Sequence, residues 1–576
     1  MVTVRPPHVL ALLLTAAALS PCFAQDHHAQ DHQAKASVSR PGGSALVTPA
    51  LKGLVFISDP NALRPNGIDA VGVITTGVDI LSRSSFRDLL TPFLGKPLTF
   101  DGLNQITHIV IAYYSSQKHP LVNAVVPEQD VQNGVIQIVV TEFRVGSIRT
   151  KGNRWFPSSV VSAPVTLHHG DTINSAELLS ELDAANANPF RHVNLVYEPA
   201  PQTGYTDLVL QTEDRFPLRF FTGFDNSGTA ATGHNRWNAG ATWGNAFGLD
   251  QQMTYQFSSS SDLYLGSSRG PGSSGGPAFA SHSLAWSMPL SFGDSISAFG
   301  DYERTVPNIG PDLDLLGLSG QASIRYNHVL PRTADFVQSL QAGYDFKTTN
   351  NNLNFGGVAI STSSLEIDQF PVSYSANFTD HWGVSSSSTT LIYSPGALTP
   401  NNTASAFQSA AAFGVGLASN RYLYLREDFS RLTKLPYGAV WSTRVVAQAS
   451  NARLLYTEQL VAGGPDLLRG YPTNSILGDE GVIVSNELRA PPIRRAFGQS
   501  ICRLQFLGFW DYGSLHANKA VAGYDGNVDA SSIGAGLRYS LRTNITAKFD
   551  YGRQLRSLPG IPGIGHNANI ALVFGN

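Results

Sequence analysis

From about Arg215 to Asn576, apolar and polar residues alternate with a period of two in one segment after another. Successive side chains of a β-strand point to opposite faces, so this pattern predicts strands that each have one apolar and one polar face. Helical spacing of apolar residues is missing from the same region. In one clear example, small or polar residues separate Leu284, Trp286, Met288, Leu290 and Phe292.

Composition helps to decide where such an apolar face is buried. Charged residues make up 14% of the chain, against about 25% in an average soluble domain. A soluble β-sandwich would turn the apolar face into its own core, and the alternation by itself allows that fold. A membrane barrel turns the same face toward lipid and its polar face toward a wet lumen. The low charge and an aromatic content of 10% favour the membrane barrel.

The N-terminus has the pattern of an export signal. Arg5 precedes an apolar run over Val9–Leu19, and Ala24 is a small residue at the expected cleavage point. We therefore expect residues 1–24 to be a signal peptide. A membrane anchor and a lipoprotein signal at Cys22 are the alternatives.

No second run of about 18 apolar residues follows the export signal, so a membrane location requires a barrel. We predict a transmembrane antiparallel β-barrel over residues 215–576. At about 22 residues for each strand and its connection, this region holds about 16 strands. The segment ending at Phe574 is expected to close the barrel. Gly266–Gly276 and Asn350–Asn354 are expected to be loops.

Two small α/β domains are expected before the barrel. Residues 25–54 are polar, and we interpret them as a linker or a weak plug segment. The order strand, helix, helix, strand, strand then occurs twice, over residues 55–142 and 143–214. In the second copy, Asn174 with Glu177 three residues later indicates the start of a helix.

The first α/β domain contains Val126-Pro-Glu-Gln-Asp130, followed by Gly134-Val-Ile-Gln-Ile-Val-Val-Thr-Glu142. These stretches resemble the first POTRA domain of two-partner secretion transporters, and the βααββ order resembles POTRA domains in general. The resemblance implies periplasmic modules that bind polypeptides, with an extended chain added at a sheet edge. The candidate substrate-binding residues are Glu128, Gln129, Val135 and Ile138.

Two short motifs lie far apart in the predicted barrel. The first is Leu468-Arg469-Gly470-Tyr471, in a Gly/Pro-rich loop near residues 460–480, and the second is Phe509-Trp-Asp511-Tyr-Gly513, in a predicted strand. Trp510 and Tyr512 belong to the apolar face of that strand, so Asp511 faces the lumen, where its charge avoids lipid. A lone arginine in a loop is most often solvated. An arginine and a carboxylate can also form a bidentate ion pair.

This motif pair resembles the signature of the outer-membrane POTRA/β-barrel superfamily of polypeptide transporters. Within it, the chain is most similar to the haemolysin secretion/activation family of two-partner secretion transporters (TpsB). The resemblance implies that the loop folds back into the barrel. It also implies that the loop motif of Leu468, Arg469, Gly470 and Tyr471 meets the wall motif of Phe509, Asp511 and Gly513. In a wet lumen we expect the ion pair to contribute only on the order of 1 kcal/mol, as a positional latch.

The resemblance also implies a location and partners. The barrel would lie in outer-membrane lipid as a monomer, with the POTRA domains in the periplasm. A secreted exoprotein would bind these domains through its N-terminal secretion domain and pass unfolded through the barrel to the cell surface. An insertase for other outer-membrane proteins and a non-specific porin are the alternatives, although two POTRA domains are fewer than insertases usually carry.

Catalytic chemistry is not expected. Two Gly-x-Ser-x-Gly matches, at Ser268 and Ser274, lie in a low-complexity stretch without the strand–turn–helix context of a nucleophile. A net charge of -3 without a basic block argues against nucleic acid. Cys22 and Cys502 are too few for a disulfide framework. We therefore expect no enzymatic activity, cofactor or metal.

Overall fold

The computed structural model describes residues 43–131, 133–265, 276–290, 293–308, 313–333, 335–355, 358–361, 364–410, 418–497, 500–518, 526–542, 544–558 and 564–576. The predicted signal peptide, residues 25–42 and the two Gly-x-Ser-x-Gly serines lie outside these ranges. The described residues fall into two compact units, one ending at Phe216 and one beginning at Pro217. No described helix is both long and apolar enough to cross a membrane.

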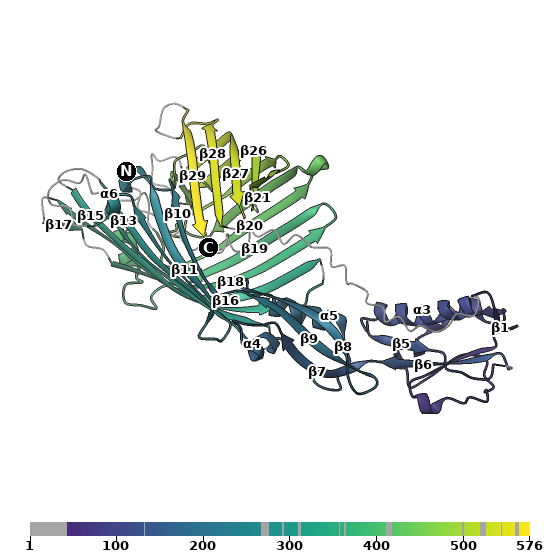
Figure 1. Cartoon of the computed structure of the whole chain (residues 1–576). Helices are drawn as coiled ribbons and strands as arrows, with labels where there is room; N and C mark the ends of the chain where they lie inside the picture. The colour runs from purple at the N-terminus through teal and green to yellow at the C-terminus, as the bar shows by residue number, and fades with distance from the viewer. Residues whose placement is uncertain are drawn as a thin grey trace. The chain divides into compact units, whose positions relative to one another are not determined.

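The first α/β module is built on a four-stranded sheet in the order β3–β2–β6–β5 (Gly72–Thr76, Gly53–Ile57, Val135–Glu142 and Val122–Val125). A two-stranded sheet joins β1 (Leu46–Thr48) to β4 (Leu98–Thr99). The helices α2 (Ser84–Leu90) and α3 (Phe100–Ser116) pack on the larger sheet (Figure 1). Phe56, Ile106 and Ile138 are fully buried between these helices and the sheet, which forms the core of the module.

The sheet of the first module begins before the predicted boundary. β2 lies between β3 and β6 and runs parallel to both. Gly53 and Leu54 are therefore part of the central strand, and the linker predicted over residues 25–54 is wrong at its C-terminal end. Every residue of β2 is buried. A strand buried on both faces shows a short apolar run in place of alternation, so the polar stretch before it hid the start of the domain.

The second α/β module repeats the expected βααββ order. Its sheet has the order β7–β9–β8 (Arg144–Lys151, Tyr205–Asp214 and Arg191–Pro199), with α4 (Ser158–Ser162) and α5 (Ser175–Ala185). Asn174 caps α5 by accepting a hydrogen bond from the Ala176 N–H at 3.0 Å, and its amide donates to Glu177. The expected helix start at Asn174 is thus confirmed.

The C-terminal unit is a closed antiparallel barrel of sixteen strands, as predicted. β17 (Val358–Ser361) and β25 (Ile493–Phe497) are short additional strands that pair with β16 and β26. The barrel strands are β10 (Leu218–Asp225), β11 (Arg236–Ala246), β12 (Gln251–Ser260), β13 (Phe279–Pro289), β14 (Ser295–Thr305), β15 (Leu313–Val329), β16 (Phe336–Phe355), β18 (Ser364–Asp380), β19 (Gly383–Ser394), β20 (Tyr422–Lys434), β21 (Val440–Ser450), β24 (Glu480–Arg489), β26 (Ser500–His516), β27 (Asn527–Leu541), β28 (Ile545–Gln554) and β29 (His566–Gly575). The connections also contain α6 (Asp262–Leu265) and α7 (Ala404–Ala410).

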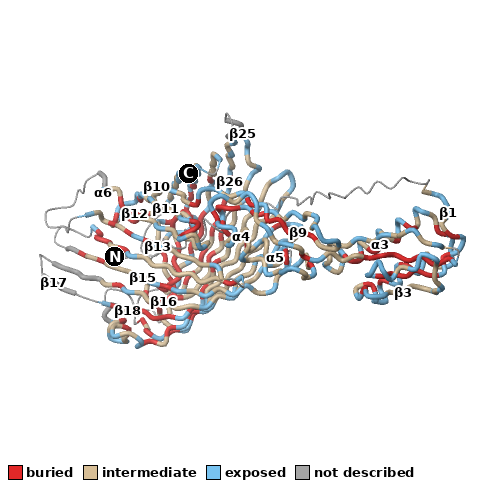
Figure 2. The backbone as a smooth tube through the Cα atoms, turned by 60° about the horizontal axis from the view of Figure 1, so that its bottom comes forward, coloured by how far each residue is buried: buried red, intermediate tan, exposed pale blue. Residues whose placement is uncertain are grey.

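Side chains alternate between the two surfaces of the barrel wall. Large apolar side chains such as Phe220, Tyr255 and Leu284 are about half exposed on the outer surface. The inner surface carries buried polar side chains such as Ser283 and Asp511. Burial therefore changes from residue to residue along many strands (Figure 2).

The Asn-rich segment Asn350–Asn354 lies in β16 and not in a loop. It pairs with β15 through Asn350↔Leu318 and Asn354↔Asp314. The predicted loop is therefore wrong. This end of β16 leads toward β17, and a strand that extends past the lipid needs no apolar face.

The last strand closes the barrel, as predicted. β29 pairs with β10 from Phe221↔Gly575 to Asp225↔Ala571, and the two strands lie side by side in Figure 1. Two asparagine side chains extend this seam. Asn226 donates to the Ala568 carbonyl at 2.7 Å and accepts from the Ile570 N–H at 2.8 Å. At the other end, the Asn576 side chain accepts from the Phe220 N–H at 2.8 Å.

We expect Asn226→Ala to weaken the seam. The variant loses two side-chain hydrogen bonds, each with a net contribution of about 1 kcal/mol, so the barrel should unfold at a lower temperature. Heat-dependent gel mobility of the purified protein measures this change. Asn235→Ala, in the exposed connection before β11, is the control and should unfold like the unmodified protein. Equal unfolding temperatures for both variants would show that Asn226 does not hold the seam.

Candidate functional site: a loop bound to the barrel wall

The long connection between β21 and β24, residues 451–479, carries the first motif, and we call it the Arg469 loop. It contains a small hairpin of β22 (Leu460–Ala462) and β23 (Ile476–Gly478). Its tip lies against inward-facing side chains of the wall, and Leu468, Arg469 and Tyr471 are each at most 3% exposed. The loop thus folds into the lumen.

Arg469 and Asp511 form a bidentate ion pair. The guanidinium donates through Nη2 to Asp511 Oδ1 at 2.7 Å and through Nε to Oδ2 at 2.9 Å. The backbone N–H of Arg469 donates to the same Oδ2 at 3.0 Å. Three donors on one loop residue therefore converge on one carboxylate of β26, which fixes both the position and the orientation of the loop tip.

The ion pair belongs to a larger charge cluster. Arg469 Nη1 also donates to Glu487 of β24, and the guanidinium lies 3.6 Å from the centre of the Phe509 ring. Arg489 donates to the other oxygen of Glu487 at 2.7 Å. In this way Glu487 links the loop arginine to a second arginine of the wall.

Burial changes the expected strength of this contact. Arg469 is 3% exposed and Asp511 is fully buried, so the pair does not lie in a wet lumen as predicted. Breaking a buried pair by removing one partner typically costs about 3–5 kcal/mol, because the other charge is left without a partner. The expectation of about 1 kcal/mol describes an exposed pair, whereas the cost of removing one partner is the relevant quantity for this buried pair.

Gly470 lets the loop lie directly on the wall. A Cβ atom at this position would come within 2.6 Å of Ser532 Cβ and 3.1 Å of the Arg553 carbonyl carbon. The Gly470 N–H donates to the Ser532 hydroxyl, and the Gly470 carbonyl accepts from Gln554 at 3.1 Å. Any side chain at residue 470 would separate the two surfaces.

Tyr471 and Leu468 fill the space on either side of this contact. The Tyr471 hydroxyl donates to the carbonyl of Ser531 or of Arg556 and accepts from the Ser531 N–H. Leu468 packs against Gly513, where a Cβ atom would lie 2.6 Å from the leucine Cδ1. The structure therefore brings the predicted loop motif and the wall motif into contact.

Sequence reasoning missed the residues that hold the stem of the Arg469 loop. The fully buried Asp479 accepts from Arg453 Nη1, the Leu454 N–H and Gln459 Nε2, all within 2.9 Å. Glu458 accepts from Lys347 of β16 at 2.7 Å. One signal was present: Asp479 directly precedes a strand, at the end of a Gly/Pro-rich loop.

Three of the four candidate substrate-binding residues of the first α/β module lie in its core or bond to its own backbone. Val135 is 3% exposed and Ile138 is fully buried, on opposite faces of β6. Neither side chain can contact a bound polypeptide, so their assignment as binding residues is wrong. Gln129 exchanges hydrogen bonds with the backbone of Gln137 at 2.7 and 2.8 Å. Glu128 is exposed.

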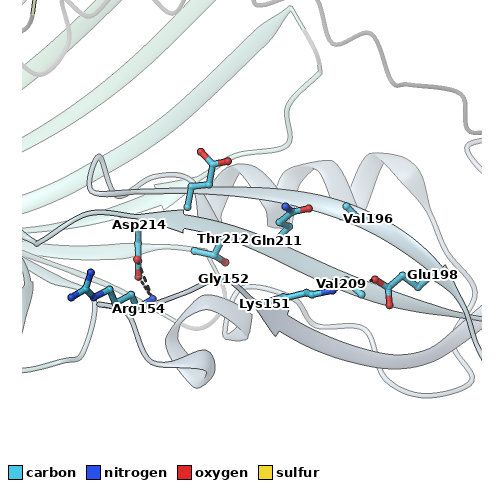
Figure 3. A pocket seen from close by; sticks show the side chains of 10 residues that line it. Lys151, Gly152, Arg154, Val196, Glu198, Val209, Gln211, Thr212 and Asp214 are labelled. Carbon is cyan, nitrogen blue, oxygen red and sulfur yellow. Dashed lines mark hydrogen bonds and ion pairs between the residues drawn. The ribbon is translucent and has the colours of Figure 1, made fainter.

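The second α/β module has an open face opposite its helices. Lys151, Val196, Glu198, Val209 and Gln211 line a hollow of about 510 Å³ on this face (Figure 3). At one end, Asp214 accepts from the backbone N–H groups of residues 154, 155 and 156. The Asp214 carboxylate thereby holds the turn after β7.

Comparison with known proteins shows the family to which this barrel and its α/β modules belong. A family model described as haemolysin secretion/activation protein ShlB/FhaC/HecB matches residues 204–539, more than half of the chain. The chain belongs to this family. A model of the ShlB-type POTRA domain matches residues 69–142, which identifies the first α/β module and leaves β2 before the matched region. The protein is thus an outer-membrane barrel with its POTRA domains in the periplasm.

Relatives of this haemolysin secretion/activation family member are outer-membrane transporters. The outer membrane transporter CdiB of Escherichia coli is 24% identical over 424 residues, which are 72% of this chain and 68% of the relative. The heme/hemopexin transporter protein HuxB of Haemophilus influenzae is 21% identical over 476 residues, 78% of this chain and 77% of the relative. The structure of CdiB from Escherichia coli aligns over the whole of both chains with a TM-score of 0.72 at 19% identity, which shows a shared fold.

Proposed function

We propose that this protein recognises an unfolded exoprotein through its POTRA domains and moves it through the barrel to the cell surface. The contact between Arg469 and Asp511 carries the proposal, because it fastens a long loop to the inside of a barrel wall. A pore that only admitted solutes would need no such contact.

The Arg469 loop must leave its position before a polypeptide can use the lumen. Its tip fills part of the space beside β26–β29 and is held by hydrogen bonds as well as by the ion pair. When the loop moves, Arg469 loses its ion pair with Asp511 and its contact with Glu487, and Glu487 keeps its contact with Arg489. Acidic or polar groups of the exoprotein can compete for Arg469 at that stage. The periplasm offers no ATP, and folding of the exoprotein outside the cell then drives its passage.

Sheet edges supply the recognition surface of the POTRA domains. β3 and β5 form the edges of the first sheet, and β7 and β8 form those of the second. An edge strand presents unpaired N–H and carbonyl groups to which an extended chain can add. Glu128 is exposed and remains a candidate contact residue for an incoming chain.

The ion pair can be tested with a double-mutant cycle. Asp511→Ala and Arg469→Ala should each lower the amount of exoprotein released into the medium, relative to the amount of barrel. The double variant should fall no further than the more affected single variant, because both changes remove one interaction. Additive losses would mean that the two residues act separately and would remove the support for a latch.

Cells that lack this protein or its POTRA domains distinguish the other two candidate functions, an insertase and a porin. Loss of an insertase depletes outer-membrane proteins broadly, whereas loss of this transporter should deplete only the secreted exoprotein. For a non-specific porin, removal of residues 43–214 would leave solute transport unchanged.

A further inference from the structure

A projecting hairpin lies at the periplasmic end of the barrel. β10 begins at Leu218, directly after the second α/β module, so this end of every strand faces the periplasm. Most described connections at this end are short turns, such as His381–Trp382 between β18 and β19. Between β24 and β26, however, β25 pairs with the first residues of β26, and Figure 2 shows β25 projecting from the barrel.

Strand pairing fixes which side of the hairpin carries its charges. Along β26, Phe506 and Trp510 are about half exposed on the lipid side, while Asp511 is buried on the lumen side. Arg503 has the parity of Asp511 and therefore lies on the lumen side. Arg494 is directly opposite Arg503 in the register, so the two guanidinium groups share that side.

Two of these charges lack a partner among the described residues. Arg494 and Arg503 are exposed, and neither guanidinium forms an ion pair or hydrogen bond with any residue that the structure describes. Lys548 is a third exposed cation on the inner surface, across from Arg538. The nearby carboxylate of Asp550 is already bound to Arg538 at 2.8 Å.

Two like charges directly opposite each other destabilise a pair of strands. Solvent and salt reduce this cost at an exposed site, and a solvated hairpin is the simplest interpretation. Charges on an edge strand also prevent unwanted pairing, but Arg503 lies on β26, which already pairs with strands on both sides. Repeated cations on one surface focus a positive potential on the entrance and favour an anionic ligand.

We propose that Arg494, Arg503 and Lys548, the basic entrance patch, bind an acidic stretch of the polypeptide on its way into the lumen. This inference rests on the proposed function. The lumen-side position favours a polypeptide over a phospholipid, whose headgroups lie around the outer surface. Among the described residues, β25 pairs only with β26, so its other edge can also receive an extended chain.

Peptide binding to the full-length protein in a neutral detergent tests the proposal. The probes are a fluorescent 12-residue peptide of Gly, Ser and Glu and a matched peptide with Lys in place of Glu. The glutamate peptide should bind, and Arg494→Glu with Arg503→Glu should weaken its binding by at least about tenfold. Salt should weaken binding to the unmodified protein. The lysine peptide should bind more tightly to the Arg494→Glu, Arg503→Glu variant than to the unmodified protein.

Arg421→Glu reverses the charge of an exposed arginine at the opposite end of the barrel, and it should leave peptide binding unchanged. Heat-dependent gel mobility confirms that each variant has a folded barrel. Equal peptide affinity in the Arg494/Arg503 variant and in the unmodified protein would overturn the proposal. So would unchanged affinity with a loss of co-purified phosphatidylglycerol, which would assign the patch to lipid. Neither result would affect export that depends on Arg469, so the proposed function is tested separately.

Discussion

Replacing Arg469 with alanine is expected to lower export of the exoprotein at least tenfold while the barrel still assembles. The change removes two hydrogen bonds from the buried Asp511 and one from the partly buried Glu487, so Asp511 is left without its ion-pair partner. Breaking a buried ion pair costs about 3–5 kcal/mol, and each 1.4 kcal/mol is a factor of about ten in an equilibrium constant. The docked loop should therefore lose at least about a hundredfold in population. Immunoblots of medium and outer membranes measure export per assembled barrel.

Arg325→Ala is the matched control for this experiment. Arg325 also forms an inward-facing ion pair with an aspartate, Asp345, at 2.5 Å, and both side chains are at most 11% exposed. That pair joins neighbouring strands β15 and β16 and does not involve the Arg469 loop. Export should therefore survive in the control. Equal loss in both variants would indicate general damage to the wall, and undiminished export in Arg469→Ala would contradict the proposed role of the loop.

Gly470→Val is expected to have a comparable effect for a steric reason. Its Cβ atom alone would approach Ser532 Cβ to 2.6 Å, and the backbone of β28 lies just behind. Because neither surface can yield without breaking wall pairing, the loop tip should separate from the wall and Arg469 should lose Asp511. Cysteine labelling at residue 467 in a Cys502→Ser background measures the separation, since a displaced tip reacts faster. Export from the same cells should fall at least about tenfold, as for the loss of the ion pair.

Gly508→Val controls for the presence of a larger side chain in the barrel. Gly508 lies in the same strand as Asp511, but a Cβ atom there would have only the Gly534 carbonyl within 4 Å, at 3.9 Å. Labelling at residue 467 and export should remain unchanged. If Gly470→Val also leaves the labelling rate unchanged, the close approach of loop and wall is not what holds the tip.

Much of this architecture could be predicted because it rests on local rules. Alternation in the last two-thirds of the chain indicates strands, and the parity of Trp510 and Tyr512 alone puts Asp511 inside the barrel. The same rules gave wrong predictions where contacts with distant parts of the chain decide the local structure. β2 is buried on both faces and shows no alternation, and the Asn-rich segment Asn350–Asn354 continues strand β16.

The two motifs of the candidate site could be predicted from the sequence. The burial of the site and the residues that hold the loop stem could not. Sequence spacing does not reveal that the loop tip packs tightly enough to bury Arg469, so the ion pair was expected to be weak. The carboxylates of Asp479 and Glu458 act through contacts with distant residues such as Lys347, which no sequence pattern connects. Val135 and Ile138 lie in a conspicuous motif, yet they are core residues of the module.

The contacts of the Arg469 tip also constrain the order in which the protein can mature. Apart from Glu487, they come from Asp511, Ser532, Gln554 and Asn569, on the final four strands of the chain. All of these strands are synthesised after the loop itself. The surface that binds the tip is therefore complete only after the C-terminal quarter of the wall has paired. A barrel in which these four strands have not paired lacks most of the surface to which the tip binds.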